Sequence, residues 1–230
     1  MTATERTLSG IAVLDGLGRD ELAALEKRCH WRRIRSRHQI IARDAESTDV
    51  YFVVRGSVRV VSYAPSGREI SFVDIGAGGM FGELSAIDGE TRSAGVMALA
   101  ETMVASLSRA VFLDLATGSP AVALAMLRHL AGTLRTATGR IFDLSTLGAH
   151  NRIHAELLRL AKPGPEEQNT AVIRPVPVHG DIASRVSTTR ETVARVLGDL
   201  GRRGLVRREG DSLIVQDLRA FIGMVKEFKG

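Results

Sequence analysis

Apolar residues follow two different periods along this chain. From Val50 to Leu107 they occur in short runs rich in β-branched residues, and glycine-rich turns separate the runs. Tyr51–Val54 and Val58–Val61, for example, flank Arg55–Ser57, which has the form of a hairpin turn. This pattern is typical of strands. It predicts an antiparallel β-barrel or sandwich, with further strands at residues 69–73, 95–99 and 103–107.

The stretch before this region is strongly basic. Residues 27–43 contain seven Lys or Arg and no acidic residue. Trp31, Ile34, Ile40 and Ile41 interrupt the charges, and the alternation predicts a strand with a solvated outer face. A nucleic-acid surface is the alternative interpretation. Ahead of it, residues 20–25 predict a short amphipathic helix.

Beyond Pro120 the period becomes helical. Apolar residues recur at alternating spacings of three and four, which is the heptad pattern of a coiled coil. Gly132 and Gly139 each lower helix stability by about 1 kcal/mol relative to alanine, so a packed partner helix is expected. A helix lying only on its own barrel is the alternative. The predicted dimer seam consists of Leu127, Leu130, Leu134, Ala137, Ile141 and Leu144.

The last third predicts a helix-turn-helix followed by a two-stranded wing. We expect helices at 180–186 and 190–202, a turn with the second helix's N-cap at 187–189, and wing strands at 205–208 and 213–215. Ahead of them come a helix at 153–160, a loop at 162–169 and an extended edge segment at 172–178 containing Pro175 and Pro177.

Length, charge and cysteine content limit the kinds of protein that this chain can be. The 230 residues suffice for two domains, and the net charge of +5 with a pI near 10.0 permits a nucleic-acid partner. Cys29 is the only cysteine, which excludes a disulfide within the chain. We see no run of 18 apolar residues and no signal peptide, so we expect a cytoplasmic protein without membrane contact.

The second helix of the helix-turn-helix carries side chains suited to DNA. Residues at the N-terminal end of such a helix reach base edges in the major groove. Arg can bond guanine O6 and N7 together, and Glu can accept from cytosine N4. Residues 179–209 carry seven Arg against four acidic residues. The expected DNA-contacting residues are Thr188, Thr189, Arg190, Glu191 and Arg195.

A second candidate site lies between Gly82 and Ala94. It begins with a glycine-led turn and the carboxylate of Glu83, and Arg92 follows nine residues after Glu83. Backbone N–H groups and a guanidinium can hold a phosphate, and a carboxylate can accept from a ribose hydroxyl. The spacing therefore indicates a ligand that combines a phosphate with a sugar.

The chain resembles the cyclic AMP receptor protein family of bacterial regulators (the Crp/Fnr superfamily). The segments that carry the resemblance are residues 51–60, 81–94 and 187–195, and the resemblance extends from about Leu14 to Ile222. The resemblance implies an effector, cAMP or cGMP, with Glu83 on the ribose 2′-hydroxyl and Arg92 on the cyclic phosphate. The remaining cassette contacts would come from Gly82, Leu84, Ser85, Ser93 and Ala94. The Glu-to-Arg interval of nine is similar to that of the cyclic-nucleotide-dependent kinases.

On the long helix this family places a Thr-Ser pair against the base. Here the pair is Ala137-Thr138, so Thr138 is expected to act without its neighbour, and adenine and guanine both stay open. The resemblance also implies a homodimer that binds double-stranded DNA at a palindrome of TGTGA-like half-sites, with Arg190, Glu191 and Arg195 on the bases and RNA polymerase as a further partner.

The resemblance implies an α+β fold. It consists of an antiparallel cyclic-nucleotide-binding β-roll of jelly-roll type (1–115), a long dimerisation helix (116–147) and a winged helix-turn-helix (148–230).

Other functions remain as alternatives. A regulator of the same fold could answer to another small molecule or to none. One cysteine is too few for an iron–sulfur sensor. His129 and His150 could in principle ligate haem, but a helical histidine is more often a surface or interface residue. A cupin-type metal enzyme needs a cluster of His and Glu ligands, and the barrel segment offers only His30 and His38. We therefore expect neither a metal, haem or cluster nor an enzymatic activity.

Overall fold

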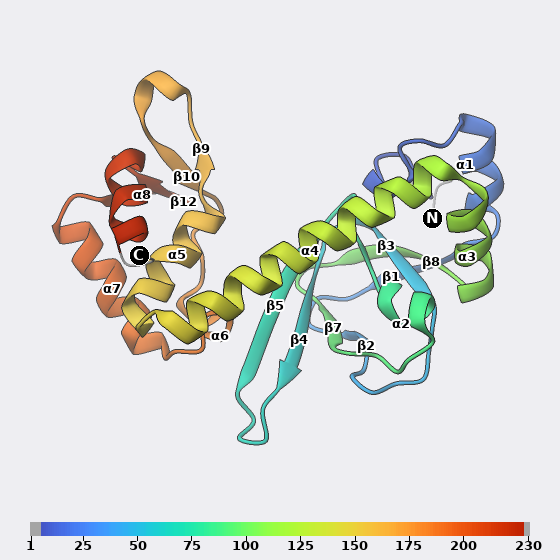
Figure 1. Cartoon of the computed structure of the whole chain (residues 1–230), viewed down its shortest axis with the longest axis horizontal. Coiled ribbons are helices and arrows are strands. Elements are labelled where there is room, and N and C mark those ends of the chain that lie inside the picture. The colour runs from blue at the N-terminus through green and yellow to red at the C-terminus, as the bar shows by residue number, and fades with distance from the viewer. Residues whose placement is uncertain (1–5, 228–230) are drawn as a thin grey trace. The chain divides into compact units, whose positions relative to one another are not determined.

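The computed structural model describes residues 6–227, and these form two compact units (Figure 1). The first unit ends at Leu134 and the second begins at Arg135, so the division falls within the long helix α4 (Pro120–Thr146). The first unit is mainly antiparallel sheet, and the second contains the predicted helix-turn-helix. The predicted fold class is confirmed.

The first unit contains two four-stranded antiparallel sheets. One has the strand order β1-β8-β3-β6 and the other β2-β7-β4-β5. The strands are β1 (His30–Ile34), β2 (Gln39–Ile41), β3 (Val50–Arg55), β4 (Ser57–Tyr63), β5 (Glu69–Gly76), β6 (Met80–Phe81), β7 (Gly95–Ala98) and β8 (Thr102–Leu107). The helices are the 3-10 helix η2 (Ala12–Leu14), α1 (Arg19–Glu26), α2 (Glu83–Asp88), α3 (Arg109–Gly118) and the first part of α4.

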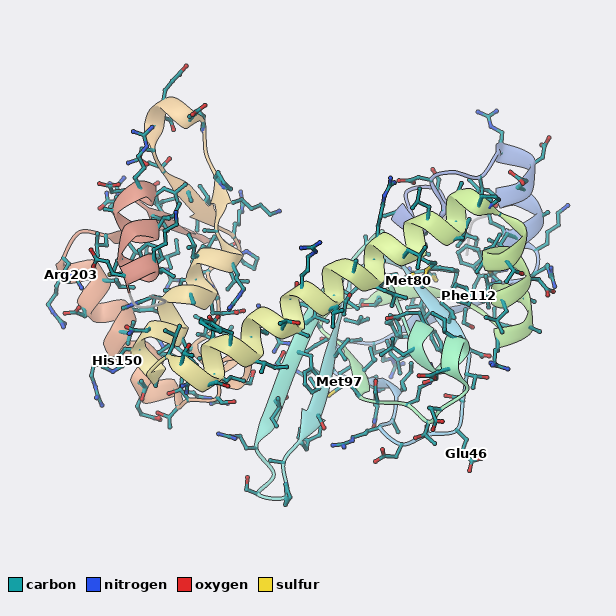
Figure 2. The ribbon with its side chains drawn as sticks, viewed as in Figure 1. Glu46, Met80, Met97, Phe112, His150 and Arg203 are labelled. Carbon is teal, nitrogen blue, oxygen red and sulfur yellow. The ribbon has the colours of Figure 1, made fainter. Side chains whose placement is uncertain are left out.

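Two apolar clusters hold this unit together. One lies between the sheets and includes Val53, Val58 and Val104, which are fully buried. The other packs the helices against β3 and includes Phe112 and Met80 (Figure 2). Short β-branched runs therefore build the roll, as the sequence predicts, and the helices close it.

The basic segment forms two strands rather than one. Ile34 in β1 and Ile41 in β2 are buried, whereas Arg32 and Arg33 are exposed. Arg37 takes a left-handed backbone with φ of 64° between the strands. The alternation therefore marks a sheet surface whose charged side chains face solvent.

The second unit contains α5, α6, α7 and α8 and one four-stranded sheet in the order β11-β12-β10-β9. The elements are α5 (Ala149–Leu160), β9 (Lys162–Pro163), the 3-10 helix η3 (Glu166–Gln168), β10 (Ala171–Ile173), α6 (His179–Arg185), α7 (Arg190–Arg202), β11 (Val206–Glu209), β12 (Ser212–Val215) and α8 (Leu218–Glu227). Ile153, Ile182, Leu200 and Phe221 are at the centre of its core.

One prediction about this sheet is wrong. The segment containing Pro175 and Pro177 was expected to be an edge strand, yet β10 pairs with β12 on one side and with β9 on the other. Strand β10 ends at Ile173, before both prolines, so their missing N–H groups do not interrupt the ladder.

Helix α4 has 27 residues and begins at Pro120, as the sequence predicts. Val122 and Met126 are buried in the first unit's core, while Leu127, Leu134 and Ile141, spaced by seven, are 64%, 68% and 64% exposed. Large aliphatic side chains that are exposed at heptad spacing indicate an apolar helix face suited to packing against a partner helix. Within residues 6–227 no single helix has the length and apolarity to cross a membrane. Helices α3 and α4 together have the necessary length and apolar composition, but the two are bent by 108° relative to each other.

Candidate functional site

A tight turn connects β6 to α2 at the start of the predicted cassette. Gly82 takes a left-handed backbone with φ of 82°. A Cβ at this position would lie 2.7 Å from Nη1 of Arg92 and 2.9 Å from the carbonyl oxygen of Asp49. Glycine is thus required both for the backbone conformation and for the close approach of the arginine.

Arg92 is almost fully buried and held by three hydrogen bonds. Its Nη1 donates to the carbonyl of Gly82 at 2.7 Å, its Nη2 to the carbonyl of Asp49 at 2.7 Å, and its Nε to the hydroxyl of Ser47 at 3.1 Å. The guanidinium carbon also lies 6.0 Å from the centre of the Tyr51 ring. The positive charge is therefore fixed in direction by neutral acceptors, and among residues 6–227 no carboxylate is hydrogen-bonded to it.

This arrangement leaves Arg92 able to hold an anion. A guanidinium has five N–H groups, and the three bonds above use one on each nitrogen, so one N–H on Nη1 and one on Nη2 remain. Burial lowers the pKa of Arg92 from its usual value, and the charges of Tyr51, Asp49 and Glu83 oppose that effect. A buried fork of this kind suits two oxygens of one phosphate.

Glu83, the first residue of α2, is also buried. Its Oε1 lies 3.7 Å from Nε2 of His129, a half-buried residue on the part of α4 that belongs to the first unit. Glu83 is also near enough to Arg92 for its charge to act on the guanidinium. The predicted carboxylate and guanidinium are therefore brought together.

The other predicted cassette residues differ in exposure. Ser85 is buried, and its hydroxyl donates to the carbonyl of Thr91 at 3.4 Å. Leu84 and Ser93 are exposed, and Ala94 is half-buried. Thr138 is exposed on the part of α4 that belongs to the second unit.

The helix-turn-helix follows the predicted boundaries closely. Helix α7 begins at Arg190 and ends at Arg202, with Thr189 as N-cap. The hydroxyl oxygen of Thr189 accepts from the N–H of Thr192 at 3.3 Å, which satisfies one of the helix's free donors. Ser187 takes a left-handed backbone with φ of 52°, the conformation that favours glycine, so this turn forms without one.

Helix α7 buries one face and presents the other. Val193, Val196 and Leu200 are buried in the unit's core. Hydrogen bonds to its own backbone N–H and to the Thr189 hydroxyl, with the nearby charge of Arg190, hold the pKa of Glu191 below its usual range. The carboxylate is therefore ionised and can act only as an acceptor. Of the predicted DNA-contacting residues, Thr189, Arg190, Glu191 and Arg195 are exposed and Thr188 is half-buried.

An arginine that sequence reasoning missed supports this turn. Arg152 of α5 donates through Nε to the carbonyl of Val186 at 2.8 Å and through Nη2 to that of Ser187 at 3.2 Å. Its Nη1 donates to the carbonyl of Leu147 at 2.8 Å, just after the end of α4. One side chain thus fixes the turn before the recognition helix relative to the residues that end α4.

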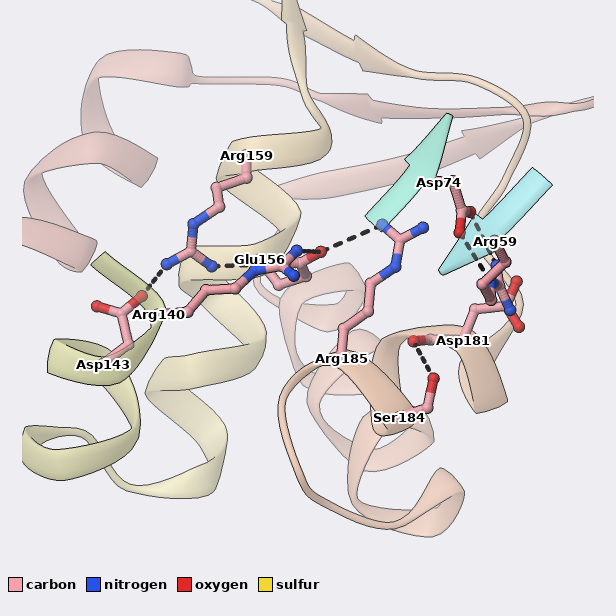
Figure 3. Close-up of polar contacts among 9 residues, drawn as sticks. All are labelled: Arg59, Asp74, Arg140, Asp143, Glu156, Arg159, Asp181, Ser184 and Arg185. Atoms are coloured by element: carbon pink, nitrogen blue, oxygen red, sulfur yellow. Dashed lines mark hydrogen bonds and ion pairs between the residues drawn. The ribbon is translucent and has the colours of Figure 1, made fainter. Parts of the chain in front are cut away.

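A buried cluster of charges connects the same elements (Figure 3). Glu156 of α5 is 1% exposed and pairs with Arg140 of α4 at 3.5 Å, with Arg159 at 3.0 Å and with Arg185 of α6 at 3.2 Å. Arg159 also pairs with Asp143 of α4. The cluster therefore joins the end of α4 to the first helix of the helix-turn-helix.

Several of these partners had no signal in the sequence. Ser47 and Asp49 hold Arg92 from a loop more than 40 residues earlier, and Asp49 does so through its backbone carbonyl, which any residue possesses. The sequence predicts His129 as a surface or interface residue, with haem ligation as the alternative, and does not predict its contact with Glu83. Among residues 6–227, no group of three His, Cys, Asp or Glu side chains is placed to hold a metal ion.

Comparisons with known families match both units. Residues 31–118 match the cyclic nucleotide-binding domain family, and residues 151–222 match the Crp-like helix-turn-helix domain family. The first match contains Glu83 and Arg92, and the second contains α6, α7 and the wing. Helix α4 lies entirely between the two matched ranges.

Several known proteins are similar to this chain over most of its length. The chain is 36% identical over 160 residues to the cyclic AMP receptor protein of Thermus thermophilus, covering 69% of this chain and 70% of that one. It is 28% identical to the CRP-like cAMP-activated global transcriptional regulator of Mycobacterium tuberculosis, covering 93% of this chain and 96% of that one. The fold is similar to that of a CooA mutant from Carboxydothermus hydrogenoformans, with a TM-score of 0.79 at 22% identity over 98% of this chain and 99% of the other.

The domain matches and these relatives agree with the geometry of both sites. The chain belongs to the CRP/FNR family of DNA-binding transcription regulators.

Proposed function

We propose that this chain is a homodimeric transcription regulator whose affinity for DNA is controlled by a cyclic nucleotide. In this proposal residues 1–115 bind the nucleotide, 116–147 form the dimer, and 148–230 bind DNA. The chain acts as a regulator and not as an enzyme, as its relatives do. The observation that carries the proposal is the buried guanidinium of Arg92, which is fixed in direction and still has N–H groups available.

In this proposal the phosphate and the ribose of the nucleotide each bind a side chain between Gly82 and Ala94. Arg92 binds the cyclic phosphate through its remaining N–H groups, and backbone and hydroxyl groups of the cassette complete that contact. Glu83 accepts from the ribose 2′-hydroxyl. Thr138 is proposed to contact the base. We favour cAMP over cGMP because several relatives are described as cAMP-activated.

The seam on α4 supports a homodimer. Leu127, Leu134 and Ile141 are exposed in the single chain at heptad spacing, and a second copy of the same helix would cover them. A dimer would also present two copies of α7. Recognition helices in such dimers enter successive major grooves about 34 Å apart, which matches a palindromic site.

Arg190, Glu191 and Arg195 are proposed to read the bases of a TGTGA-like half-site. All three are exposed near the N-terminal end of α7, where side chains of a recognition helix reach base edges. Thr188 and Thr189 are proposed to contact phosphates. RNA polymerase is proposed as a further partner of the DNA-bound dimer.

Titration calorimetry with cAMP and cGMP tests the effector assignment. Arg92→Leu should weaken binding at least about a hundredfold, because two charge-assisted hydrogen bonds of about 1.5–3 kcal/mol each are lost. Arg92→Lys keeps the charge but not the fork, so its affinity should be intermediate. Arg68→Leu, at an exposed arginine in the β4–β5 turn, is the matched control.

Circular dichroism should show all variants folded. Unchanged binding by Arg92→Leu would contradict the cassette assignment. Failure of the natural chain to bind either nucleotide would favour a regulator of the same fold that answers to another molecule or to none.

A further inference from the structure

The side chain of His129 connects the cassette to the long helix. His129 lies on the face of α4 that packs on the first unit, one turn after the buried Met126. Its Nε2 is 3.7 Å from Oε1 of Glu83. A buried carboxylate is costly unless it is paired, and His129 supplies a cation for it from α4 when its ring is protonated.

The surroundings of His129 contain few other charges. It lines a pocket of about 420 Å³ together with Arg128, its neighbour on α4. The other residues that line the pocket have no ionisable side chain: Ala12, Val13, Gly78, Gly79, Met80 and Ala125. Among the described residues, Glu83 from α2 is the charged group that acts on the imidazole, and Arg128 is its charged neighbour on α4.

The carboxylate of Glu83 has capacity for a second partner. The pair with His129 uses Oε1, and among the described residues Oε2 has no hydrogen-bond partner. A carboxylate oxygen accepts hydrogen bonds, and a ribose hydroxyl can donate one. One oxygen thus faces α4 while the other stays available to a ligand.

We propose that His129 is a positioning residue for Glu83. It holds the carboxylate through Oε1, so that Oε2 can accept a hydrogen bond from the ribose hydroxyl. Through this contact His129 links the bound nucleotide to α4. This inference rests on the proposed function, because it assumes a cyclic nucleotide on Glu83. The same helix continues into the unit that contains the helix-turn-helix. His129 therefore gives α4 a direct contact with the group that recognises the effector.

Protonation of His129 controls this link. The carboxylate of Glu83, 3.7 Å away, raises the pKa of His129 above its usual value, against an opposing effect of burial. A pair with a raised pKa is complete at low pH and is lost as the pH rises through that pKa. Nucleotide affinity should therefore be highest when His129 is protonated and should fall as the pH rises through its pKa.

The first test needs no ligand. NMR titration of the His129 ring in the full chain should give a pKa above the usual histidine value, and Glu83→Gln should lower it toward that value. An unchanged His129 pKa in the Glu83→Gln variant would overturn the pairing itself.

The second test is calorimetry with cAMP and cGMP between pH 5.5 and 8.5. The cyclic phosphodiester keeps one negative charge over this range. The natural chain should lose affinity as the pH rises. His129→Gln keeps a neutral donor, so it should bind within about threefold of the natural chain and lose most of the pH dependence. His129→Leu should bind about tenfold more weakly at low pH, the effect of one charge-assisted hydrogen bond.

Arg128→Gln is the matched control, since it removes a charge from the adjacent position of α4 and should keep the pH dependence. Affinity that rises with pH, or equal pH dependence in the natural chain and His129→Gln, would overturn the role of His129. Failure of the natural chain to bind either nucleotide at any pH would instead overturn the proposed function, and with it this inference.

Discussion

At the scale of single residues, Gly82 and Arg92 depend on one another. Gly82 has a backbone that an L side chain rarely adopts, and its missing Cβ leaves the space that Nη1 of Arg92 occupies. Its carbonyl then accepts from the same nitrogen. One glycine therefore both forms the turn and sets the position of the guanidinium.

Replacing Gly82 by Ala should displace Arg92. We expect a loss of about 1–2 kcal/mol in the free energy of unfolding from the left-handed backbone, and a loss of nucleotide binding from the clash. Gly67→Ala is the control, because Gly67 has a similar φ of 77° and nothing within 4 Å of the added Cβ. Chemical denaturation should show a larger loss for Gly82→Ala, because only its Cβ meets Arg92 and the carbonyl of Asp49, and calorimetry should show lost binding only for Gly82→Ala. Equal binding by the two variants would contradict this account.

At the scale of elements, buried charges fix the end of α4 against α5 and α6. Glu156 accepts from three arginines, one on each of these helices (Figure 3). Removing one partner from a buried cluster leaves the remaining charges uncompensated. The cluster therefore specifies one arrangement of the helices around the DNA-binding turn.

Glu156→Ala should destabilise the second unit by about 3–5 kcal/mol, since it leaves three arginines without their shared carboxylate. Glu167→Ala, at an exposed position of the 3-10 helix η3, should change stability by less than about 0.5 kcal/mol. Urea unfolding followed by circular dichroism measures both. A loss below 1 kcal/mol for Glu156→Ala would show that the cluster has little structural effect.

The sequence was most informative where the deciding interactions are local. Helix α7 has the predicted bounds because Thr189 caps it and its apolar residues repeat at helical spacing. The edge strand was wrongly predicted because Pro175 and Pro177 lie beyond β10, a boundary that only pairing with β9 and β12 reveals. Ser47 and Asp49, which hold Arg92, and His129, which pairs with Glu83, are 43 to 46 residues away from them in sequence, and no local pattern identifies such contacts.

At the scale of the whole molecule, the proposed function requires two copies of the chain. An effector shifts an equilibrium only by its differential affinity for two states, and in a dimer those states can differ in the arrangement of the α4 helices. The exposed heptad seam is the feature of the single chain that supports this arrangement.

Leu134→Glu should disrupt the dimer. Leu134 is 68% exposed in the single chain and lies in the seam, so two glutamates would face each other when the helices pair. We expect sedimentation to show a shift from dimer toward monomer, with at least tenfold weaker association. Thr136→Glu adds the same charge at an exposed position that faces away from the seam and should stay dimeric. A dimeric Leu134→Glu variant would place the dimer interface elsewhere.

In the proposed function, nucleotide binding controls the affinity of the dimer for DNA. Fluorescence anisotropy with a palindromic TGTGA duplex, at one fixed salt concentration, measures this control directly. We predict at least tenfold tighter binding of the full chain with cAMP or cGMP than without, a coupling within the range of about 5- to 150-fold that is usual for allosteric proteins. Arg92→Leu should show no such difference. Equal affinity of the natural chain for the duplex with and without both nucleotides would contradict the account.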